Sequence, residues 1–207
     1  MSNEIMQIIA LLEISITCAV VLIYICQKIF GVEAPFIMRI VLLLILVNLL
    51  FWPLGMGMEL PLAAYVRGVT GDLSIVTMLL LWASVLPKRK SVPISFIALV
   101  SLVAVPFYPM ALGFGMTDPY AWGYGSIVLV GAVITIAFIC CLTNWTKGAW
   151  ILSFALIAWS FHWHESSNLW DYVIDPFLVF WAIFTIMHRL QQQRRQKHQS
   201  GYLFRSG

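Results

Sequence analysis

The stretch MQIIALLEISITCAVVLIYICQK, residues 6–28, decides the fold class of this chain. At about 1.5 Å per residue it is long enough to cross the roughly 30 Å hydrocarbon layer of a membrane as one helix. Its only charged residue before Lys28 is Glu13. The 207 residues are 61% hydrophobic and 10% charged, whereas a soluble domain carries about 25% charged residues. We therefore predict an all-α, polytopic transmembrane helix bundle.

Hydropathy divides the chain into seven candidate spans of this kind. They cover residues 6–28, 36–55, 72–87, 93–112, 125–143, 148–163 and 175–190. Residues 1–190 are predicted to form one transmembrane helical domain, followed by a basic cytoplasmic tail over residues 191–207. We expect the first span to be retained, because no basic region precedes it and no small-residue cleavage site follows it.

The charges of the chain are sorted between the two ends of these spans. One end receives nearly all bases: Lys28, Arg39, Lys88, Arg89, Lys90, Lys147, Arg189, Arg194, Arg195, Lys197 and Arg205. The other end has Arg67 as its one base. Its acids are Glu4, Glu59, Asp72, Asp118, Glu165, Asp171 and Asp175. Cytoplasmic loops carry the excess of Lys and Arg. The N-terminus is therefore predicted outside and the C-terminus in the cytoplasm, in a multi-pass protein of the cell inner (plasma) membrane.

The tail is interpreted as a topology anchor, or as a surface for anionic lipid or a partner protein.

The first outer segment, residues 55–74, contains that single outer base. Arg67 has two interpretations. It pairs with Asp72, Glu59 or Glu13 as a structural clamp, or its guanidinium holds a phosphate or carboxylate, which suits its parallel N–H donors. Asp72 is also predicted to open the third span and to cap it by accepting from backbone N–H groups.

The third outer segment, HWHESSNLWDYVIDP over residues 162–176, is the richest in polar side chains. His162, His164 and Glu165 are of the types that bind zinc or similar ions. The two imidazoles would lie on different faces of a helix, and a site would need a further ligand, such as Glu59 or Asp118. We predict no metal here.

A hydrogen-bonded interfacial loop is the preferred interpretation of the same segment. Asn168 or Asp171 then caps a short helix that carries Trp170. Asp175 followed by Pro176 is a typical helix start, with Asp at the cap and Pro at the first helical position.

Glu13 lies about two turns inside the first span. An ionisable group in a membrane usually faces a cavity or a partner. Its depth places it within reach of outer-loop side chains, and Asn48 in the second span is a predicted neighbour. Structural pairing and a role toward a substrate or a proton both stay open.

The segment YVRGVTGDLSIVTMLLL, residues 65–81, resembles part of the membrane region of lipoteichoic acid synthases and related phosphoethanolamine or phosphoglycerol transferases. The matching positions are Arg67, Gly68, Asp72 and Leu73, because a span in that family often opens with Arg-Gly and then Asp-Leu-Ser/Thr. The family's catalytic threonine and metal ligands belong to a large extracytoplasmic domain with no counterpart in these 207 residues. The resemblance therefore implies a lipid-facing membrane unit in envelope assembly and carries over no catalytic residue.

Three functions fit these features. The first is an accessory or assembly subunit of a bacterial-type cell-envelope lipid or glycan pathway, with a polar site at the outer membrane face. The second is a membrane-embedded enzyme that acts on an anionic lipid head group at that face. The third is a small-solute transporter or channel.

The residues that we expect to carry this function come from the outer segments and the first span. Candidate catalytic residues are Glu13, Arg67, His164 and Glu165. Candidate substrate-binding residues are Arg67, Glu59, Asp72, Asn168 and Asp171. No phosphate loop, nucleophile elbow, HExxH or haem motif occurs, and no cofactor is indicated. The expected partners are the lipid bilayer and a membrane or periplasmic protein, with no nucleic acid.

Overall fold

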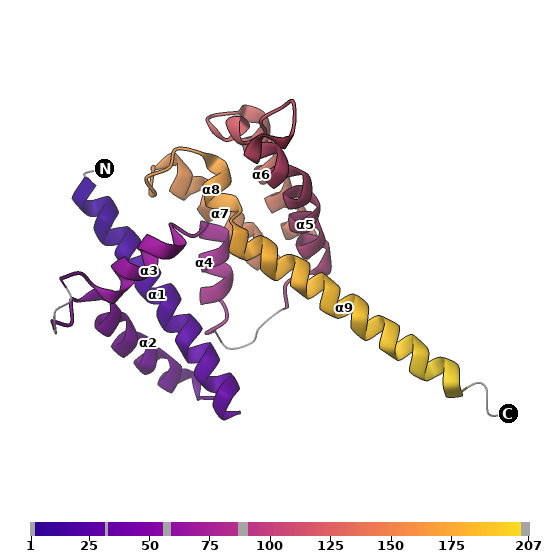
Figure 1. Cartoon of the computed structure of the whole chain (residues 1–207), viewed down its shortest axis with the longest axis horizontal. Helices are drawn as coiled ribbons and strands as arrows, with labels where there is room; N and C mark the ends of the chain where they lie inside the picture. The colour runs from indigo at the N-terminus through magenta and orange to yellow at the C-terminus, as the bar shows by residue number, and fades with distance from the viewer. Residues whose placement is uncertain (1–2, 32, 56–58, 87–90, 204–207) are drawn as a thin grey trace. The chain divides into compact units, whose positions relative to one another are not determined.

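The computed structural model describes residues 3–31, 33–55, 59–86 and 91–203, with side chains for residues 4–195 of these ranges. In this part of the chain every regular element is a helix (Figure 1), so the all-α prediction is confirmed. The elements are α1 (Asn3–Phe30), α2 (Phe36–Phe51), α3 (Leu62–Thr70), α4 (Ile75–Trp82), α5 (Ile94–Pro109), the π-helical turn η1 (Met110–Phe114), the 3-10 turn η2 (Tyr120–Gly123), α6 (Ile127–Leu142), α7 (Thr146–Ser160), α8 (Leu169–Val173) and α9 (Pro176–Leu203). Of the predicted inner bases, Lys88, Arg89, Lys90 and Arg205, and the side chain of Lys197, lie outside the described residues.

Two helical stretches among the described residues combine the length and the apolar composition needed to cross a membrane. They are Glu4–Phe30 and Ile94–Phe114. The helices α2 and α6 are apolar as well, with 16 residues each.

The third predicted span, 72–87, contains a helix of only 8 residues, α4. Ser74 sets its start, because the Ser74 hydroxyl accepts a hydrogen bond from the Thr77 N–H at 3.2 Å. The prediction that Asp72 caps this span is therefore wrong, since the cap lies two residues later. After Trp82 the chain leaves the helix in a series of turns.

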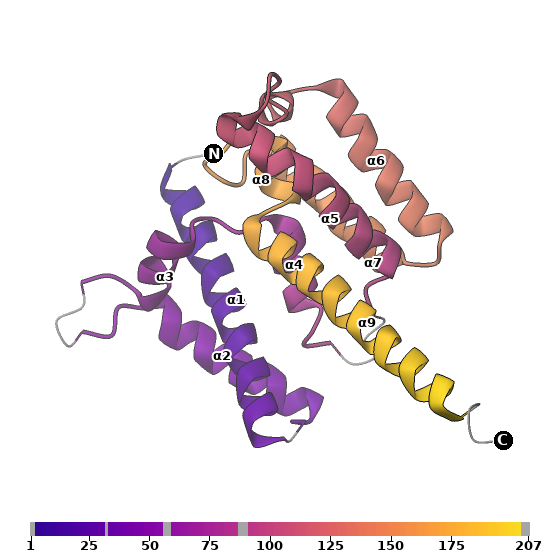
Figure 2. The same ribbon diagram turned by 45° about the vertical axis from the view of Figure 1, so that its right-hand side comes forward.

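The chain forms two compact units, and the first contains residues 1–90 and 120–175. In this unit α1 packs against α2, α3 and α4 (Figure 2), and α7 packs against α4, α6 and α8. The buried stripe of α1 includes Ala10, Ile14 and Thr17, the spacing at which one helix face meets a core. Glu13 lies on the same buried side, so an acid is held inside the unit.

The second unit contains residues 91–119 and 176–207, in which α5 packs against α9. Two prolines, Pro106 and Pro109, lie inside α5 near its end. Proline cannot donate its backbone nitrogen to a helix, and α5 passes into the π-helical turn η1, which ends around Gly113 at φ 90°. The helix α9 begins at Pro176, as predicted, and continues through Leu203. The first part of the predicted basic tail is thus a continuation of this helix.

Candidate functional site

The site begins at the end of α3, in the first unit. Gly71 follows α3 at φ 70°, and its N–H donates to the Arg67 carbonyl at 2.8 Å. Glycine adopts positive φ at little cost, so the chain reverses here and brings Asp72 back beside the last turn of α3. The local sequence Arg-Gly-Val-Thr-Gly-Asp thereby builds an ion pair from two residues five apart.

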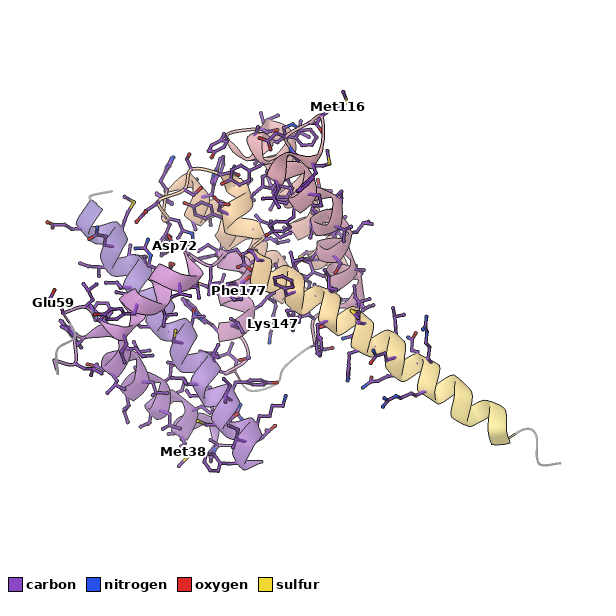
Figure 3. All side chains as sticks on the ribbon, viewed as in Figure 1. Met38, Glu59, Asp72, Met116, Lys147 and Phe177 are labelled. Atoms are coloured by element: carbon purple, nitrogen blue, oxygen red, sulfur yellow. The ribbon has the colours of Figure 1, made fainter. Side chains whose placement is uncertain are left out.

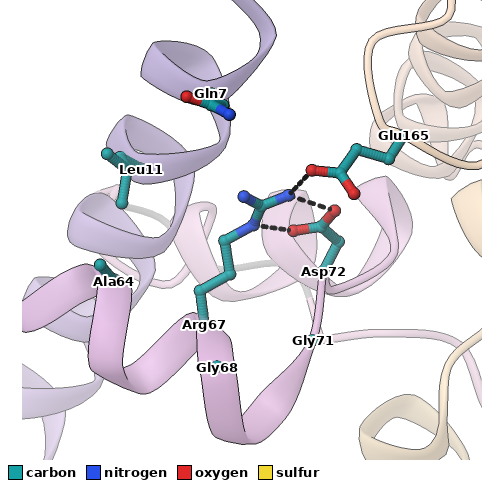
Figure 4. Close-up of a pocket in the computed structure, with 8 residues that line it drawn as sticks. All are labelled: Gln7, Leu11, Ala64, Arg67, Gly68, Gly71, Asp72 and Glu165. Carbon is teal, nitrogen blue, oxygen red and sulfur yellow. Dashed lines mark hydrogen bonds and ion pairs between the residues drawn. The ribbon is translucent and has the colours of Figure 1, made fainter. Parts of the chain in front are cut away.

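Arg67 donates two parallel hydrogen bonds to Asp72 (Figure 4). The Nε group donates to Oδ1 at 2.5 Å and Nη2 donates to Oδ2 at 2.9 Å. Hydrogen bonding to Asp72 raises the pKa of Arg67 above its ordinary value. Burial acts to raise the pKa of Asp72, but the hydrogen bonds and charge of Arg67 outweigh it and hold that pKa below its ordinary value. Of the predicted clamp partners, Asp72 is the one confirmed.

Arg67 also reaches a segment 98 residues away in the sequence. Its Nη2 donates to Glu165 Oε1 at 2.9 Å. The two acceptors differ in exposure, since 23% of the Asp72 side chain is exposed and 67% of the Glu165 side chain. Asp72 is thus a largely shielded partner of the guanidinium, whereas Glu165 is a partner whose side chain is mostly exposed to solvent.

A cavity of about 440 Å³ opens beside this ion pair (Figure 4). Its lining comes from α1, α3, the turn before α4 and the loop after α7: Gln7, Leu11, Ala64, Arg67, Gly68, Gly71, Asp72 and Glu165. Small side chains on α3 leave the space, and the Nη1 group of Arg67 points toward α1 (Figure 4). The cavity therefore combines a guanidinium, two carboxylates and an apolar wall.

A buried acid–imidazole pair joins the buried side of α1 to the loop after α7. His164 Nε2 lies 3.2 Å from Glu13 Oε2, with 2% and 11% of these side chains exposed. The His164 ring stacks on the ring of Tyr172 at a centroid distance of 4.8 Å. The Tyr172 hydroxyl accepts from the His164 N–H and donates to the Ser166 carbonyl, both at 2.9 Å. Neither Glu13 nor His164 lines the cavity.

The outer loop that carries Glu165 is fixed by its own hydrogen bonds, as predicted. Asn168 caps α8 by accepting from the Trp170 N–H at 2.9 Å, and its amide donates to the Tyr120 carbonyl. Asp171 accepts from the hydroxyls of Tyr120 and Ser166. Burial, together with the hydrogen bond to Asp171, raises the pKa of Tyr120 above its ordinary value. The loop is thus a rigid support for Glu165 on one side and His164 on the other.

The structure brings four predicted site residues into one cluster: Glu13, Arg67, His164 and Glu165. Asp72 joins them. Asn168 and Asp171 are engaged in the loop's own hydrogen bonds and do not line the cavity.

Three predicted neighbours lie apart from this cluster. Glu59 is exposed at the periphery of its unit (Figure 3), and neither Arg67 nor Glu13 pairs with it. Asn48 is exposed on α2, and the partner of Glu13 is His164 instead.

The histidines of the third outer segment are separated by their backbone. His162 has a positive φ of 51° and is exposed, whereas His164 is buried. Across the residues that the structure describes, no group of three or more His, Cys, Asp and Glu side chains is placed to hold a metal ion.

Sequence reasoning missed the apolar and neutral part of the cavity. Gln7, one polar residue near the start of an apolar span, is the only signal that pointed toward it. Leu11 and Ala64 carry no such signal, because they resemble any other residue of a hydrophobic helix.

No protein-family profile matches the chain, and no curated protein or solved structure is significantly similar to it. The resemblance at residues 65–81 stays a prediction, and the function is argued from the site itself.

Proposed function

We propose that the chain is a multi-pass inner-membrane protein that serves as an accessory or assembly subunit of a cell-envelope lipid or glycan pathway. Its N-terminus lies outside, its C-terminus lies in the cytoplasm, and the chain crosses the membrane in the seven predicted spans, the third of which contains the short helix α4. At the outer end of the first unit, the Arg67 cavity binds an anionic head group of a lipid-linked substrate.

The distribution of polar groups in the first unit supports this orientation. The cavity gathers Arg67, Asp72 and Glu165 near the N-terminal end of α1. At the opposite end of α1, Gln27 lines a much smaller space together with Arg39. These are the two ends that the sorting of charges assigns to the outside and to the cytoplasm. The exposed apolar residues of α6, such as Ile127 and Phe138, then face lipid.

The observation that carries the anion-binding proposal is the carboxylate of Glu165 on Arg67 Nη2. A carboxylate oxygen occupies the position on a guanidinium that a phosphate oxygen also takes. Since two thirds of the Glu165 side chain is exposed, moving it into water costs little. Asp72 holds the guanidinium in place through Nε and Nη2. An incoming anion that replaces Glu165 therefore meets a preorganised donor.

An accessory role fits the site better than catalysis. General acid–base catalysis requires the base within hydrogen-bond reach of the reacting group. His164 and Glu13 are buried and do not line the cavity. The enzyme alternative keeps one supporting observation, which is that His164 Nε2 lies 3.2 Å from Glu13 Oε2 in the same unit.

A binding experiment with four variants tests the proposal. The purified protein in a mild detergent would be titrated with a short-chain phosphatidic acid. Arg67→Met should weaken binding by about tenfold or more, which corresponds to a lost charged hydrogen bond. Glu165→Gln should strengthen binding by several-fold, because it weakens the internal competitor. Arg39→Lys, at the opposite end of the unit, and Glu59→Gln, which is exposed, should bind as the wild type does.

Equal binding by the wild type and both cavity variants would contradict the anion site. The accessory role has a separate test in co-purification under mild detergent. A lone chain that restores the pathway's activity in proteoliposomes without any partner would count against it. Loss of catalytic turnover in such proteoliposomes on His164→Ala or Glu13→Gln, at unchanged lipid binding, would favour the enzyme alternative.

A further inference from the structure

One face of α2 is exposed along the whole helix and has a polar residue, Asn48, in its C-terminal half. Exposed positions of this face are Ile37, Val41, Leu44, Ile45 and Asn48. At 100° per residue all five lie within about a third of the helix circumference. The opposite side of α2 packs against α1 in the first unit. The face is therefore a continuous stripe that no helix of its own unit covers.

The spacing along this stripe is that of a helix–helix seam. Ile37, Val41, Leu44 and Asn48 follow one another at steps of four, three and four residues, which is the a/d pattern of helices that pack side by side. Leu44, Ile45, Asn48 and Leu49 lie together on an open part of this surface.

Asn48 is costly if this face meets lipid. Its amide has two N–H donors and a carbonyl acceptor, and hydrocarbon offers none of them a partner. Polar residues in membrane helices usually face another helix and form hydrogen bonds there. The position of Asn48 on the seam indicates that the covering element is a helix that also carries an amide or a similar group at this depth.

We propose that the α2 stripe is the contact between two copies of this chain. Two copies in one membrane share the same orientation, so their α2 helices run parallel around a two-fold axis along the membrane normal. Each residue then meets its own counterpart at the same depth. An amide is both donor and acceptor, so the two Asn48 side chains satisfy each other. A single Asn at such a seam position also fixes register and two-chain association in parallel helix pairs.

This inference rests on the proposed membrane location but not on the Arg67 cavity. The test uses the full-length chain with its four cysteines replaced by alanine and single cysteines introduced on α2, oxidised in native membranes. Leu44→Cys and Val41→Cys should give a disulfide-linked product of twice the chain mass. Leu46→Cys, about 180° away from Ile37 on the helix, is the control and should give none. Adding Asn48→Leu to Leu44→Cys should lower the yield of dimer by about 3- to 20-fold, as expected for loss of one interhelical hydrogen bond. Asn48→Gln should retain most of it.

Three results would overturn the proposal. One is equal cross-linking at Leu44→Cys and Leu46→Cys, and another is a cross-linked product that contains a different protein. The third is the absence of dimer at Val41→Cys and Leu44→Cys in a chain that stays in the membrane through alkaline extraction, which would leave the proposed membrane location intact. Release of the chain by alkaline extraction would instead overturn the membrane location and this inference together.

Discussion

Arg67 ties together two segments that are far apart in the sequence. It holds Asp72 through two hydrogen bonds and Glu165 through one. The first partner is mostly shielded from water and the second is mostly exposed. Most of the cluster's contribution to the free energy of unfolding therefore comes from the Arg67–Asp72 pair, because exposed ion pairs contribute little to stability.

A double-mutant cycle measures the coupling free energy between Arg67 and Asp72. Arg67→Met should lower the free energy of unfolding in mixed micelles by about 1–3 kcal/mol, because Asp72 loses its charged hydrogen-bond partner. Arg67→Met combined with Asp72→Asn should be less destabilising than the sum of the two single changes. The same cycle on Arg39 and Glu33, whose ion pair is at 3.5 Å with an exposed carboxylate, is the control and should show a coupling near zero. Additivity of the Arg67 and Asp72 changes to within about 0.5 kcal/mol would contradict a coupled pair.

The lowered pKa of Asp72 makes a second prediction, on acid stability. When the folded-state pKa lies below the unfolded one, the unfolded chain takes up a proton first as the pH falls. The stabilisation from Asp72 is thus fully present above about pH 5 and is lost as the pH drops below about 4, the ordinary Asp value, and on through the folded pKa. Thermal unfolding between pH 6 and pH 2.5 should show a steeper loss of stability for the wild type than for Asp72→Asn. Glu59→Gln should keep the wild-type slope, and parallel curves for the wild type and Asp72→Asn would sink the prediction.

Residue types in the sequence predicted the partners in this cluster but not all of their pairings. Arg67 stood out as one base among outer acids, and a partner for it was predicted correctly in Asp72. The Glu13–His164 pair was not predicted, because a contact over 151 residues depends on how α1 and the loop after α7 come together in the fold. Sequence patterns report which face of a helix is apolar and leave open which other segment meets it.

At the scale of elements, the 3-10 turn η2 and the helix α8 fit together with no spare room. A Cβ at Gly123 would lie 1.5 Å from Oδ1 and 2.4 Å from Cγ of Asn168. Asn168 is fully buried and caps α8, so it cannot move aside without losing its hydrogen bonds. The close approach explains why a glycine stands at position 123.

Gly123→Ala should therefore destabilise the protein by about 1–3 kcal/mol, the usual range for overpacking. Gly131→Ala in α6 is the matched control, since a Cβ there meets nothing within 4 Å. It should leave the free energy of unfolding unchanged or raise it by up to about 1 kcal/mol, as for alanine replacing glycine in a helix. Equal unfolding free energies for the two variants would show that η2 and α8 do not pack in this way.

Element boundaries were predictable where a strong local signal exists. Pro176 is the first residue of α9 and Asn168 caps α8, as predicted. The third span was predicted too long because residues 73–86 are almost entirely apolar. Hydropathy cannot separate a helix from turns inside such a run, and the Ser74 cap rather than apolar content fixes the start of α4.

At the scale of the whole molecule, the sorting of charges and the position of the cavity lead to one proposal. Two of the segments that sequence analysis assigns to the outer face, residues 55–74 and 162–176, build the Arg67 cavity together with α1 in the first unit. Charge asymmetry is a property of the sequence and could be read without a structure. The convergence of residues 67, 72 and 165 required the fold.

Accessibility of Gly68→Cys tests most directly that the cavity faces the outside. Gly68 lines the cavity, and a Cβ there meets nothing within 4 Å, so the new side chain is accommodated. In a chain with its four cysteines replaced by alanine, a membrane-impermeant maleimide should label Gly68→Cys in intact cells. Thr143→Cys, exposed at the predicted cytoplasmic end of the fifth span, should be labelled only after permeabilisation. Labelling of Gly68→Cys only after permeabilisation, or of both positions equally in intact cells, would contradict an outward-facing site.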